Sequence, residues 1–319
     1  MKLALQMFRF ILFQFLFLSH AQLLAQSTKL IDVYLEEDTS NYTAVNFDAL
    51  FIERWDTLAQ VKFWRKVMNY GADTCIINIA ATRQILGYEN VVKWTAQSED
   101  QKLLYKDSVR TVHNLDSNER IYVTFGKRDF YLIEKTFPSV SKAIALFQEF
   151  KTDPWFAQAI LLIESPGKMA YSNAGAYGPF QLMKSVARTH GLIVNREIDE
   201  RKNFDKSAKA ASSLLSKVCI PEAKRILDQM EIKYSESDLW FKFIVLHIYH
   251  AGAGNVGGLL QQLKAQKTGI PLICWIWQNE WGGFKNASQN YSQVAIASLL
   301  GLHDFIYNKC HSVHECNEF

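Results

Sequence analysis

The chain contains 319 residues, of which 49% are hydrophobic and 21% charged, the composition of a packed globular protein with one large domain or two smaller ones. Six Pro and fifteen Gly are too few for a fibrous or disordered chain. The 35 Lys and Arg against 32 Asp and Glu give a net charge of +3. A nearly neutral chain lacks the concentrated basic face that binding to nucleic acid requires, so nucleic acid is excluded as the main partner.

Residues 1–25 have the pattern of a signal peptide. Lys2 and Arg9 lie at its start, a short apolar stretch follows, and small residues come after it at Ala21 and Ala25. These are the features that signal peptidase recognises. The apolar stretch is shorter than the roughly 20 residues that a membrane-spanning helix needs. We therefore expect cleavage near Ala21 or Ala25, export of the remainder, and no stable membrane span afterwards.

Residues 26–140 are predicted to form an N-terminal, mostly helical accessory region. Apolar side chains three and four positions apart predict helices over 50–115. The β-branched and aromatic run 121–125, just before Gly126, predicts a strand. Because this run is short, we expect an isolated hairpin or an edge element rather than a sheet. Lys127 is expected in a solvated loop, and the region as a whole either packs against the following domain or extends its cleft.

Residues 141–309 carry a stronger helical pattern. Asp153 and Pro154 open a helix well, because Asp caps free backbone amides and Pro fits the first turn. The run that follows is almost wholly apolar as far as Ile163, which predicts a helix buried on most sides. It should end just before Pro166. Further helices are expected at 179–190, 206–218, 238–250, 255–266 and 289–308.

The C-terminal tail, 310–319, contains two of the five cysteines. Cys310 and Cys316 are placed to close a small disulfide loop, and the odd total leaves at least one free thiol. Their spacing fits no standard zinc pattern. His247 and His250, three apart on a predicted helix, have no third ligand at a matching spacing. We therefore expect no metal.

Glu164 is the residue best suited to chemistry. It ends the apolar run that leads to Ile163, so its carboxyl enters low-dielectric surroundings that disfavour the charged form and raise its pKa. The negative end of its own helix acts in the same direction. A carboxyl that stays protonated near neutral pH is what a general acid for glycosidic cleavage requires. The alternative is a buried Glu164 paired with a Lys or Arg.

Several motifs follow Glu164 in order. They are Ser165, directly after it, then Gly175-Ala176-Tyr177-Gly178-Pro179-Phe180-Gln181-Leu182-Met183, then Tyr249-His250-Ala251-Gly252-Ala253-Gly254, and last Asn290-Tyr291-Ser292-Gln293-Val294. Together they resemble the catalytic domain of the soluble lytic transglycosylase family, lysozyme-like enzymes that cut bacterial peptidoglycan. The resemblance covers roughly residues 145–305, and its specificity comes from the order of the motifs.

The resemblance implies a mainly α-helical fold, with a lysozyme-like catalytic domain of the goose-type and lytic transglycosylase kind after the N-terminal extension. It implies that Glu164 is the single catalytic acid and base and that the other motif residues bind or orient the substrate: Ser165, Gly175, Tyr177, Gln181, Met183, Tyr249, His250 and Tyr291. His250 stands where the family has Asn, which puts the fine substrate preference in question. Trp275, Trp277 and Trp281 are candidates for the rim of the cleft.

The resemblance also implies the reaction. Glycan strands of peptidoglycan would be cut between N-acetylmuramic acid and N-acetylglucosamine without water or cofactor, leaving a 1,6-anhydro end, and an exported enzyme would do this in the periplasm. Two alternatives remain open. A goose-type muramidase would hydrolyse the bond and need a second carboxylate, with Asp199, Glu200 or Asp205 as candidates. A non-catalytic glycan-binding or scaffold protein of the cell wall would need no acid.

Overall fold

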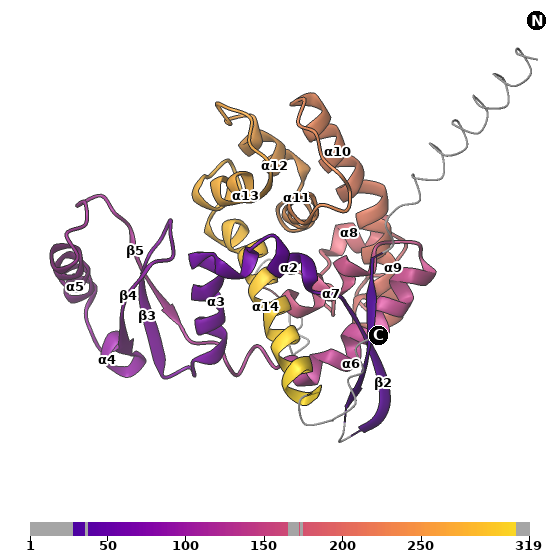
Figure 1. The fold of residues 1–319 in the computed structure, drawn as a ribbon, viewed down its shortest axis with the longest axis horizontal. Helices are drawn as coiled ribbons and strands as arrows, with labels where there is room; N and C mark the ends of the chain where they lie inside the picture. The colour runs from indigo at the N-terminus through magenta and orange to yellow at the C-terminus, as the bar shows by residue number, and fades with distance from the viewer. Residues whose placement is uncertain (1–27, 36–37, 165–171, 173–174, 311–319) are drawn as a thin grey trace, which may run out of the picture.

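The computed structural model describes residues 28–35, 38–164, 172 and 175–310. A helical domain makes up most of the molecule, and a small sheet with two helices projects from one side of it (Figure 1). The predicted mainly α-helical fold is confirmed. The predicted signal peptide and most of the C-terminal tail lie outside the described residues. Within the part of the chain that is described, no helix is both long and apolar enough to cross a membrane.

The described chain begins with a hairpin that packs on the helical domain. Strands β1 (Leu30–Leu35) and β2 (Asp38–Val45) pair antiparallel. The buried side-chain amide of Gln158, in helix α7 (Pro154–Glu164), accepts from Val45 N at 2.8 Å and donates to Val45 O at 3.3 Å. Because Gln158 satisfies both backbone groups of Val45, the hairpin is fixed directly to the helix that ends at Glu164.

The projecting part contains a sheet that the sequence pattern did not predict. After α2 (Asp48–Ile52), the 3₁₀ turn η1 (Trp55–Thr57) and α3 (Ala59–Asn69), the chain forms β3 (Thr74–Ile79), β4 (Ile85–Asn90), α4 (Val91–Thr95), α5 (Glu99–Val112) and β5 (Ile121–Phe125). The strand order is β4-β3-β5, and both pairings are antiparallel.

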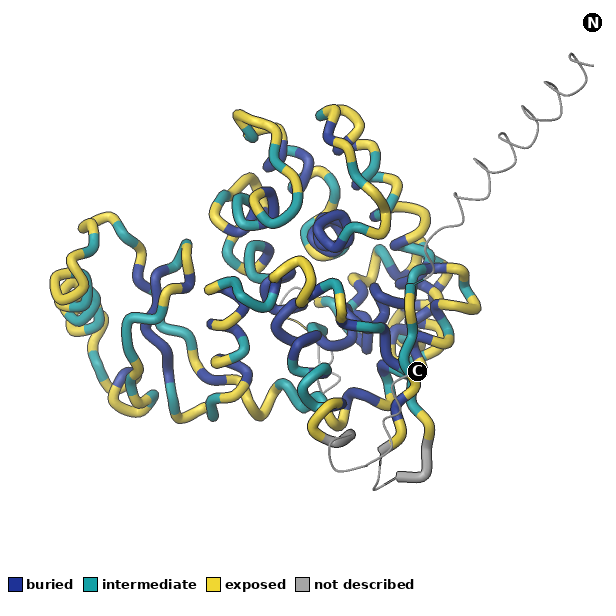
Figure 2. Tube along the Cα trace, viewed as in Figure 1, coloured by how far each residue is buried: buried dark blue, intermediate teal, exposed yellow. Residues whose placement is uncertain are grey.

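Two expectations for this region are therefore corrected. Residues 74–90, expected to be helical, form two strands, because Ile77 and Ile79 bury their side chains with Ile121 in a small separate core. Strand β5 does lie at an edge, but it pairs along its length with β3 instead of standing alone. Helix α5 covers this sheet without burying any residue completely, and it is largely exposed in Figure 2.

The helical domain follows the predicted pattern more closely. It comprises α6 (Ile133–Glu149), α7, α8 (Lys184–Thr189), the 3₁₀ turn η2 (Glu200–Lys202), α9 (Phe204–Leu214), the π-helical turn η3 (Leu215–Cys219), α10 (Ile220–Gln229), α11 (Leu239–Ala251), α12 (Ala253–Leu260), α13 (Gly269–Gln278) and α14 (Asn286–Cys310). Asp153 caps α7 as predicted, accepting from Trp155 N at 2.9 Å. Residues 154–162 of α7 and 239–248 of α11 are buried throughout.

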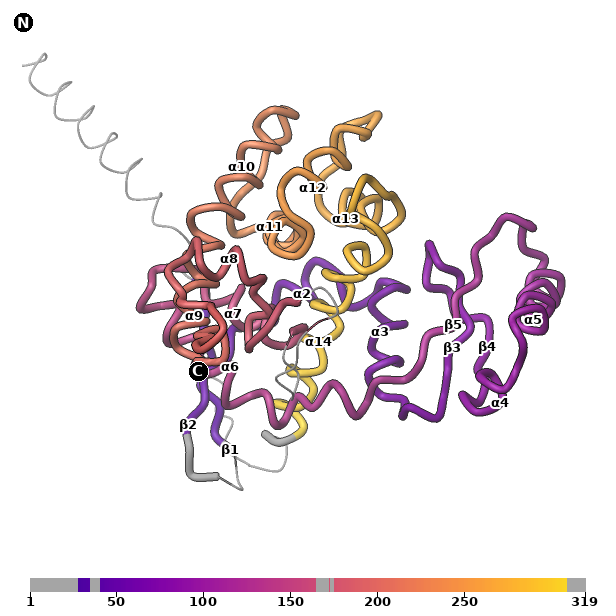
Figure 3. Tube along the Cα trace, turned by 180° about the vertical axis from the view of Figure 1, so that it is seen from behind, coloured from indigo at the N-terminus to yellow at the C-terminus, as the bar shows by residue number. Residues whose placement is uncertain are grey.

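Helix α14 connects the two parts of the molecule. It packs against α7, α6 and α11 of the helical domain and against α3 on the side of the sheet. Viewed from behind, the connection between β5 and α6 leads from the sheet back to the helical domain (Figure 3). The surface between the sheet and the end of α7 is therefore built from both the accessory region and the helical domain.

Candidate active site

Glu164 lies at the end of α7 and is half-buried. Loss of water raises the pKa of its carboxyl from 4.5 to about 7, and a hydrogen bond from Tyr291 acts in the opposite direction. The Tyr291 hydroxyl donates to Glu164 Oε1 at 2.6 Å. No Lys or Arg among the described residues forms an ion pair with Glu164. Among the described residues, Glu164 therefore does not form the buried ion pair that was the alternative prediction.

Helices α11 and α14 place three aromatic side chains beside the acid. The rings of His250 and Tyr291 stack with centroids 4.4 Å apart and an interplanar angle of 21°. The Tyr249 hydroxyl donates to Phe180 O at 2.7 Å. Burial lowers the pKa of His250, which favours the neutral imidazole at pH 7, and raises the pKa of Tyr249, with a further contribution from the charge of Glu164. Both groups therefore remain uncharged next to Glu164.

A second hydrogen-bond chain fixes α11 to α14 beneath these residues. Ser292 Oγ lies 2.8 Å from His247 Nε2 and accepts from Trp277 Nε1 at 2.8 Å. All three side chains are buried. His247 is thus a core residue, and among the described residues no three His, Cys, Asp or Glu side chains come together as a metal site. The predicted disulfide between Cys310 and Cys316 involves side chains that lie outside the described part of the chain.

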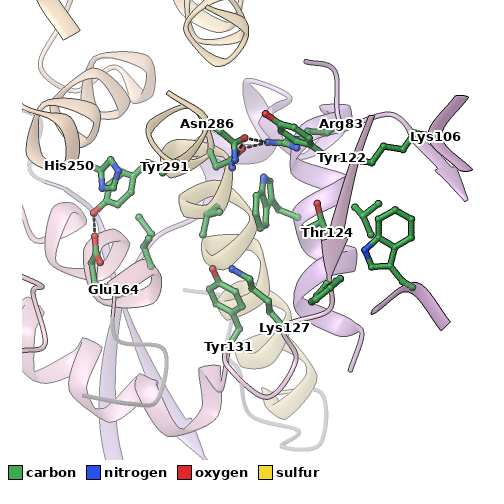
Figure 4. A pocket seen from close by; sticks show the side chains of 18 of the residues that line it. Arg83, Lys106, Tyr122, Thr124, Lys127, Tyr131, Glu164, His250, Asn286 and Tyr291 are labelled. Carbon is green, nitrogen blue, oxygen red and sulfur yellow. Dashed lines mark hydrogen bonds between the residues drawn. The ribbon is translucent and has the colours of Figure 1, made fainter. Parts of the chain in front are cut away.

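Glu164 opens into a groove of about 880 Å³ between the helical domain and the sheet. Figure 4 shows Glu164, His250 and Tyr291 on one side of this groove and Lys106 on the other. The residues between them come from β5, from the connection to α6, from α3 and from α14: Tyr122, Thr124, Lys127, Tyr131, Trp64, Asn286 and Asn290. The accessory region therefore both packs against the helical domain and extends its cleft.

Arg83 fixes the sheet to α14. Its guanidinium donates to Asn286 Oδ1 at 2.7 Å and to Asn290 Oδ1 at 2.6 Å, and it lies 5.3 Å from the centroid of the Tyr122 ring. Arg83 is buried, and the loss of water lowers its pKa to about 10. Because Asn290 directly precedes Tyr291, the link from the sheet to α14 lies one residue from the hydroxyl that contacts the acid.

The motif Gly175–Met183 forms a loop next to the site and does not line the groove. The buried guanidinium of Arg201, paired with Asp199 at 2.7 Å, donates to Gly175 O and Leu182 O at 2.9 Å each. Gly178 has a φ of +84°, and an added Cβ would lie 2.0 Å from Arg201 O. The loop therefore depends on a glycine at this position and on the Asp199–Arg201 pair.

The predicted binding residues divide into three groups. Glu164, His250 and Tyr291 come together at the groove. Tyr249 does not line the groove, and its hydroxyl donates to Phe180 O of the Gly175–Met183 loop. Four residues lie on that loop: Gly175, Tyr177, Gln181 and Met183. Ser165 falls outside the described residues. The hydroxyl of Tyr249 thus joins the loop to the helix that carries His250.

The tryptophans expected at the rim of the cleft lie elsewhere. Trp277 is buried, and neither Trp275 nor Trp281 lines the groove. Trp64 and Trp94 of the accessory region line it instead. Trp64 lies on α3 and donates to Gln293 of α14 at 3.1 Å, and Trp94 lies on α4 next to the sheet. Their places in the groove therefore depend on packing between distant segments, which the local sequence pattern does not show.

The carboxylates considered for a hydrolytic mechanism are paired away from the groove. Asp199 binds Arg201, Glu200 binds Lys206, and Asp205 binds Lys142. The other described carboxylate that lines the groove is Glu99, whose ion pair with Lys102 measures 2.7 Å. None of the carboxylates considered for hydrolysis therefore faces the space next to Glu164.

Residues 142–269 match the family model of the transglycosylase SLT domain. The resemblance drawn from the motifs is confirmed over this segment, which includes Glu164, the Gly175–Met183 loop and the end of α11. Such a domain indicates a transglycosylase that acts on the glycan of peptidoglycan. Tyr291 and the accessory region lie outside the matched residues. No curated protein matches the chain.

Proposed function

From a transglycosylase SLT domain over residues 142–269, we propose that this protein is an exported lytic transglycosylase that cleaves the β-1,4 bond between N-acetylmuramic acid and N-acetylglucosamine without water. The observation that carries the proposal is the carboxyl of Glu164, whose pKa is raised to about 7 at one end of the groove. A group with this pKa is protonated often enough near neutral pH to act as an acid, and its conjugate base can then accept a proton.

The reaction needs one carboxyl. Glu164 donates its proton to the glycosidic oxygen as the bond between that oxygen and C1 of the muramoyl residue breaks. The 2-acetamido carbonyl oxygen stabilises the positive charge that develops at C1. The C6 hydroxyl of the same sugar then attacks C1 and gives its proton to the Glu164 carboxylate, which restores the acid. The products are a new chain end with a free hydroxyl and a 1,6-anhydro end, and no water is consumed.

Tyr291 and His250 support this cycle through Glu164. The Tyr291 hydroxyl, 2.6 Å from Glu164 Oε1, stabilises the carboxylate after the first proton transfer and keeps its pKa from rising further. The stacked, neutral His250 adds no charge that would stabilise the carboxylate more strongly. Both residues act as positioning residues that keep Glu164 able to donate and accept within one turnover.

Mass spectrometry of the fragments released from purified sacculi tests the proposal. We expect fragments with anhydromuramoyl ends, and none from Glu164→Gln. Glu149→Gln is the matched control, because Glu149 also ends a helix, α6, but is exposed and lies outside the groove; it should keep its activity. Hydrolysed ends, each heavier by one water, would indicate a muramidase. Binding to sacculi without any released fragment would indicate a scaffold protein.

Export to the periplasm is a separate part of the proposal and rests on residues 1–25. We expect the full chain to be processed and recovered in the periplasmic fraction. A chain that lacks residues 1–25 should stay in the cytoplasm and yield no anhydro ends in the wall. Recovery of the full chain in the cytoplasm would contradict this part without affecting the catalytic part.

A further inference from the structure

Basic residues outnumber acidic ones along the groove. Four basic residues line the groove, Arg83, Lys102, Lys106 and Lys127, against two acidic ones, Glu99 and Glu164. Lys102 is neutralised by Glu99 at 2.7 Å, and Glu164 is about half protonated near pH 7. The remaining three basic groups therefore give the groove a net positive charge.

Lys106 and Lys127 form no ion pair within the described part of the chain. The charge of Lys106 acts at longer range, where it adds to the hydrogen bond from Lys102 in lowering the pKa of Glu99. Among the described residues, no Asp or Glu lies within ion-pair distance of Lys106 or Lys127. Lys106 Nζ lies 5.9 Å from the centroid of the Trp94 ring, and Lys127 Nζ lies 6.0 Å from that of Trp64. Aromatic rings attract an ammonium group only weakly compared with an anion. Both ammonium groups thus keep hydrogen-bonding capacity for a ligand.

The position of Lys127 is fixed by the backbone. Lys127 N donates to Val67 O at 2.7 Å, and Gly126 N donates to Thr74 O at 2.8 Å. An added Cβ at Gly126 would lie 2.1 Å from Gly71 O, so only glycine permits this close approach. With Arg83 holding the sheet to α14, Lys127 has a defined position relative to Glu164.

We propose that Lys106 and Lys127 form a subsite for the carboxylates of the peptides that peptidoglycan glycan strands carry. This inference rests on the proposed function and adds to it that the preferred substrate bears charged peptides. Sugar hydroxyls are neutral, so on a strand that carries peptides the charged partners for these ammonium groups are the peptide carboxylates. A strand stripped of its peptides would offer instead the lactyl carboxylates of N-acetylmuramic acid, which lie closer to the sugar chain. The groove continues from Glu164 to Lys106 (Figure 4), so a substituent on the strand bound at Glu164 reaches the lysines within one cavity.

The test compares two forms of the same strands. One form carries native peptides, and in the other the peptide carboxylates are converted to primary amides, which removes the charge and keeps the size. We expect kcat/KM of the unaltered enzyme to be about 2- to 30-fold higher on the native form, since two exposed ion pairs of about 0.2–1 kcal/mol each contribute about 0.4–2 kcal/mol. Added salt should reduce this preference.

The double variant Lys106→Gln, Lys127→Gln should bring the ratio close to one, and Lys106→Arg, Lys127→Arg should keep it. Lys93→Gln is the matched control, because Lys93 is exposed on α4 and does not line the groove; its ratio should equal that of the unaltered enzyme. Thermal melts of all variants show whether the fold is retained.

The outcomes separate this inference from the proposed function. If the unaltered enzyme cuts neither form, the proposed function fails. If it cuts both forms equally, or if the glutamine variant keeps the preference, the function stands and the peptide subsite is refuted. If polyglycerol phosphate inhibits cleavage at lower concentrations than the free peptide does, the lysines bind a phosphate polymer and the assignment to peptides is overturned.

Discussion

Replacing Tyr291 by Phe removes one hydroxyl from the candidate site and keeps the ring that stacks on His250. That hydroxyl donates to Glu164 Oε1 at 2.6 Å and lowers the pKa of the carboxyl, against the effect of burial. A hydrogen bond to a charged group contributes about 1.5–3 kcal/mol. At about 1.4 kcal/mol for each pKa unit, its loss should raise the pKa of Glu164 by about 1 to 2 units.

The assay is the rate of release of anhydro ends as a function of pH. Because the first step needs protonated Glu164, kcat/KM should fall as pH rises through the pKa of the free enzyme, at about 7. In Tyr291→Phe the pH at which kcat/KM falls should be higher by about 1 to 2 units, the shift expected for the lost hydrogen bond. The activity that remains would then extend further into the alkaline range, even if the maximal rate is lower.

Tyr249→Phe is the matched control. Tyr249 is also a tyrosine close to Glu164, but its hydroxyl donates to Phe180 O and not to the acid. Its loss should weaken the loop that holds Phe180 and should not move the alkaline fall upward. If the fall stays in place or moves to lower pH in Tyr291→Phe, or moves upward equally in both variants, the assignment of Tyr291 as the donor that sets the pKa of Glu164 is refuted.

Three further predictions concern stability. The pKa of Glu164 rises from 4.5 to about 7 on folding, so the protein should lose stability as pH rises through this range. Glu164→Gln removes this loss, so the gain in Tm that it gives should grow over the same range. A gain in Tm that is independent of pH would contradict this reasoning. Arg83→Ala removes the guanidinium that donates to Asn286 and Asn290 of α14, of which only Asn286 keeps another donor among the described residues, and it opens a cavity. Urea denaturation should therefore show a loss of about 2–4 kcal/mol. An unchanged midpoint would rule out Arg83 as the link between the sheet and α14. Gly178→Ala places a side chain at a positive φ and against Arg201 O, and should reduce the free energy of unfolding by about 1–3 kcal/mol. In the control Gly254→Ala, the glycine is helical and the added Cβ has no atom within 4 Å, so stability should be unchanged or increased. Equal effects of the two substitutions would contradict the clash at Gly178.

The features that the sequence predicted depend on local signals. Asp153 and Pro154 begin α7, the apolar run that follows buries it, and Glu164 is its last residue. Each of these follows from the chemistry of neighbouring residues. The raised pKa of Glu164 also follows from its position after an apolar run, because desolvation is its largest cause.

The features that the sequence did not predict depend on pairing between distant segments. Residues 74–90 show apolar spacing compatible with a helix, and they become strands because β3 pairs with β5, more than 40 residues away, as in Cys75 with Phe125. Arg83 could not be identified as the link to α14, since its partners lie 203 and 207 residues further along the chain. Lys127 was noted beside Gly126, but its place in the groove depends on that sheet.

The hydrogen bond between Tyr291 and Glu164 has a consequence for modular exchange of this domain. The segment that matches the family model stops at residue 269, so a transplant cut at its limits would carry the acid and leave behind the hydroxyl that tunes it. It would also leave behind Val45, whose backbone forms two hydrogen bonds with the side-chain amide of Gln158 in α7, the helix that carries Glu164. The smallest portable unit that retains both contacts extends from the first hairpin to α14. A recombination point between Glu164 and Tyr291 would separate the acid from the hydroxyl that regulates its proton affinity.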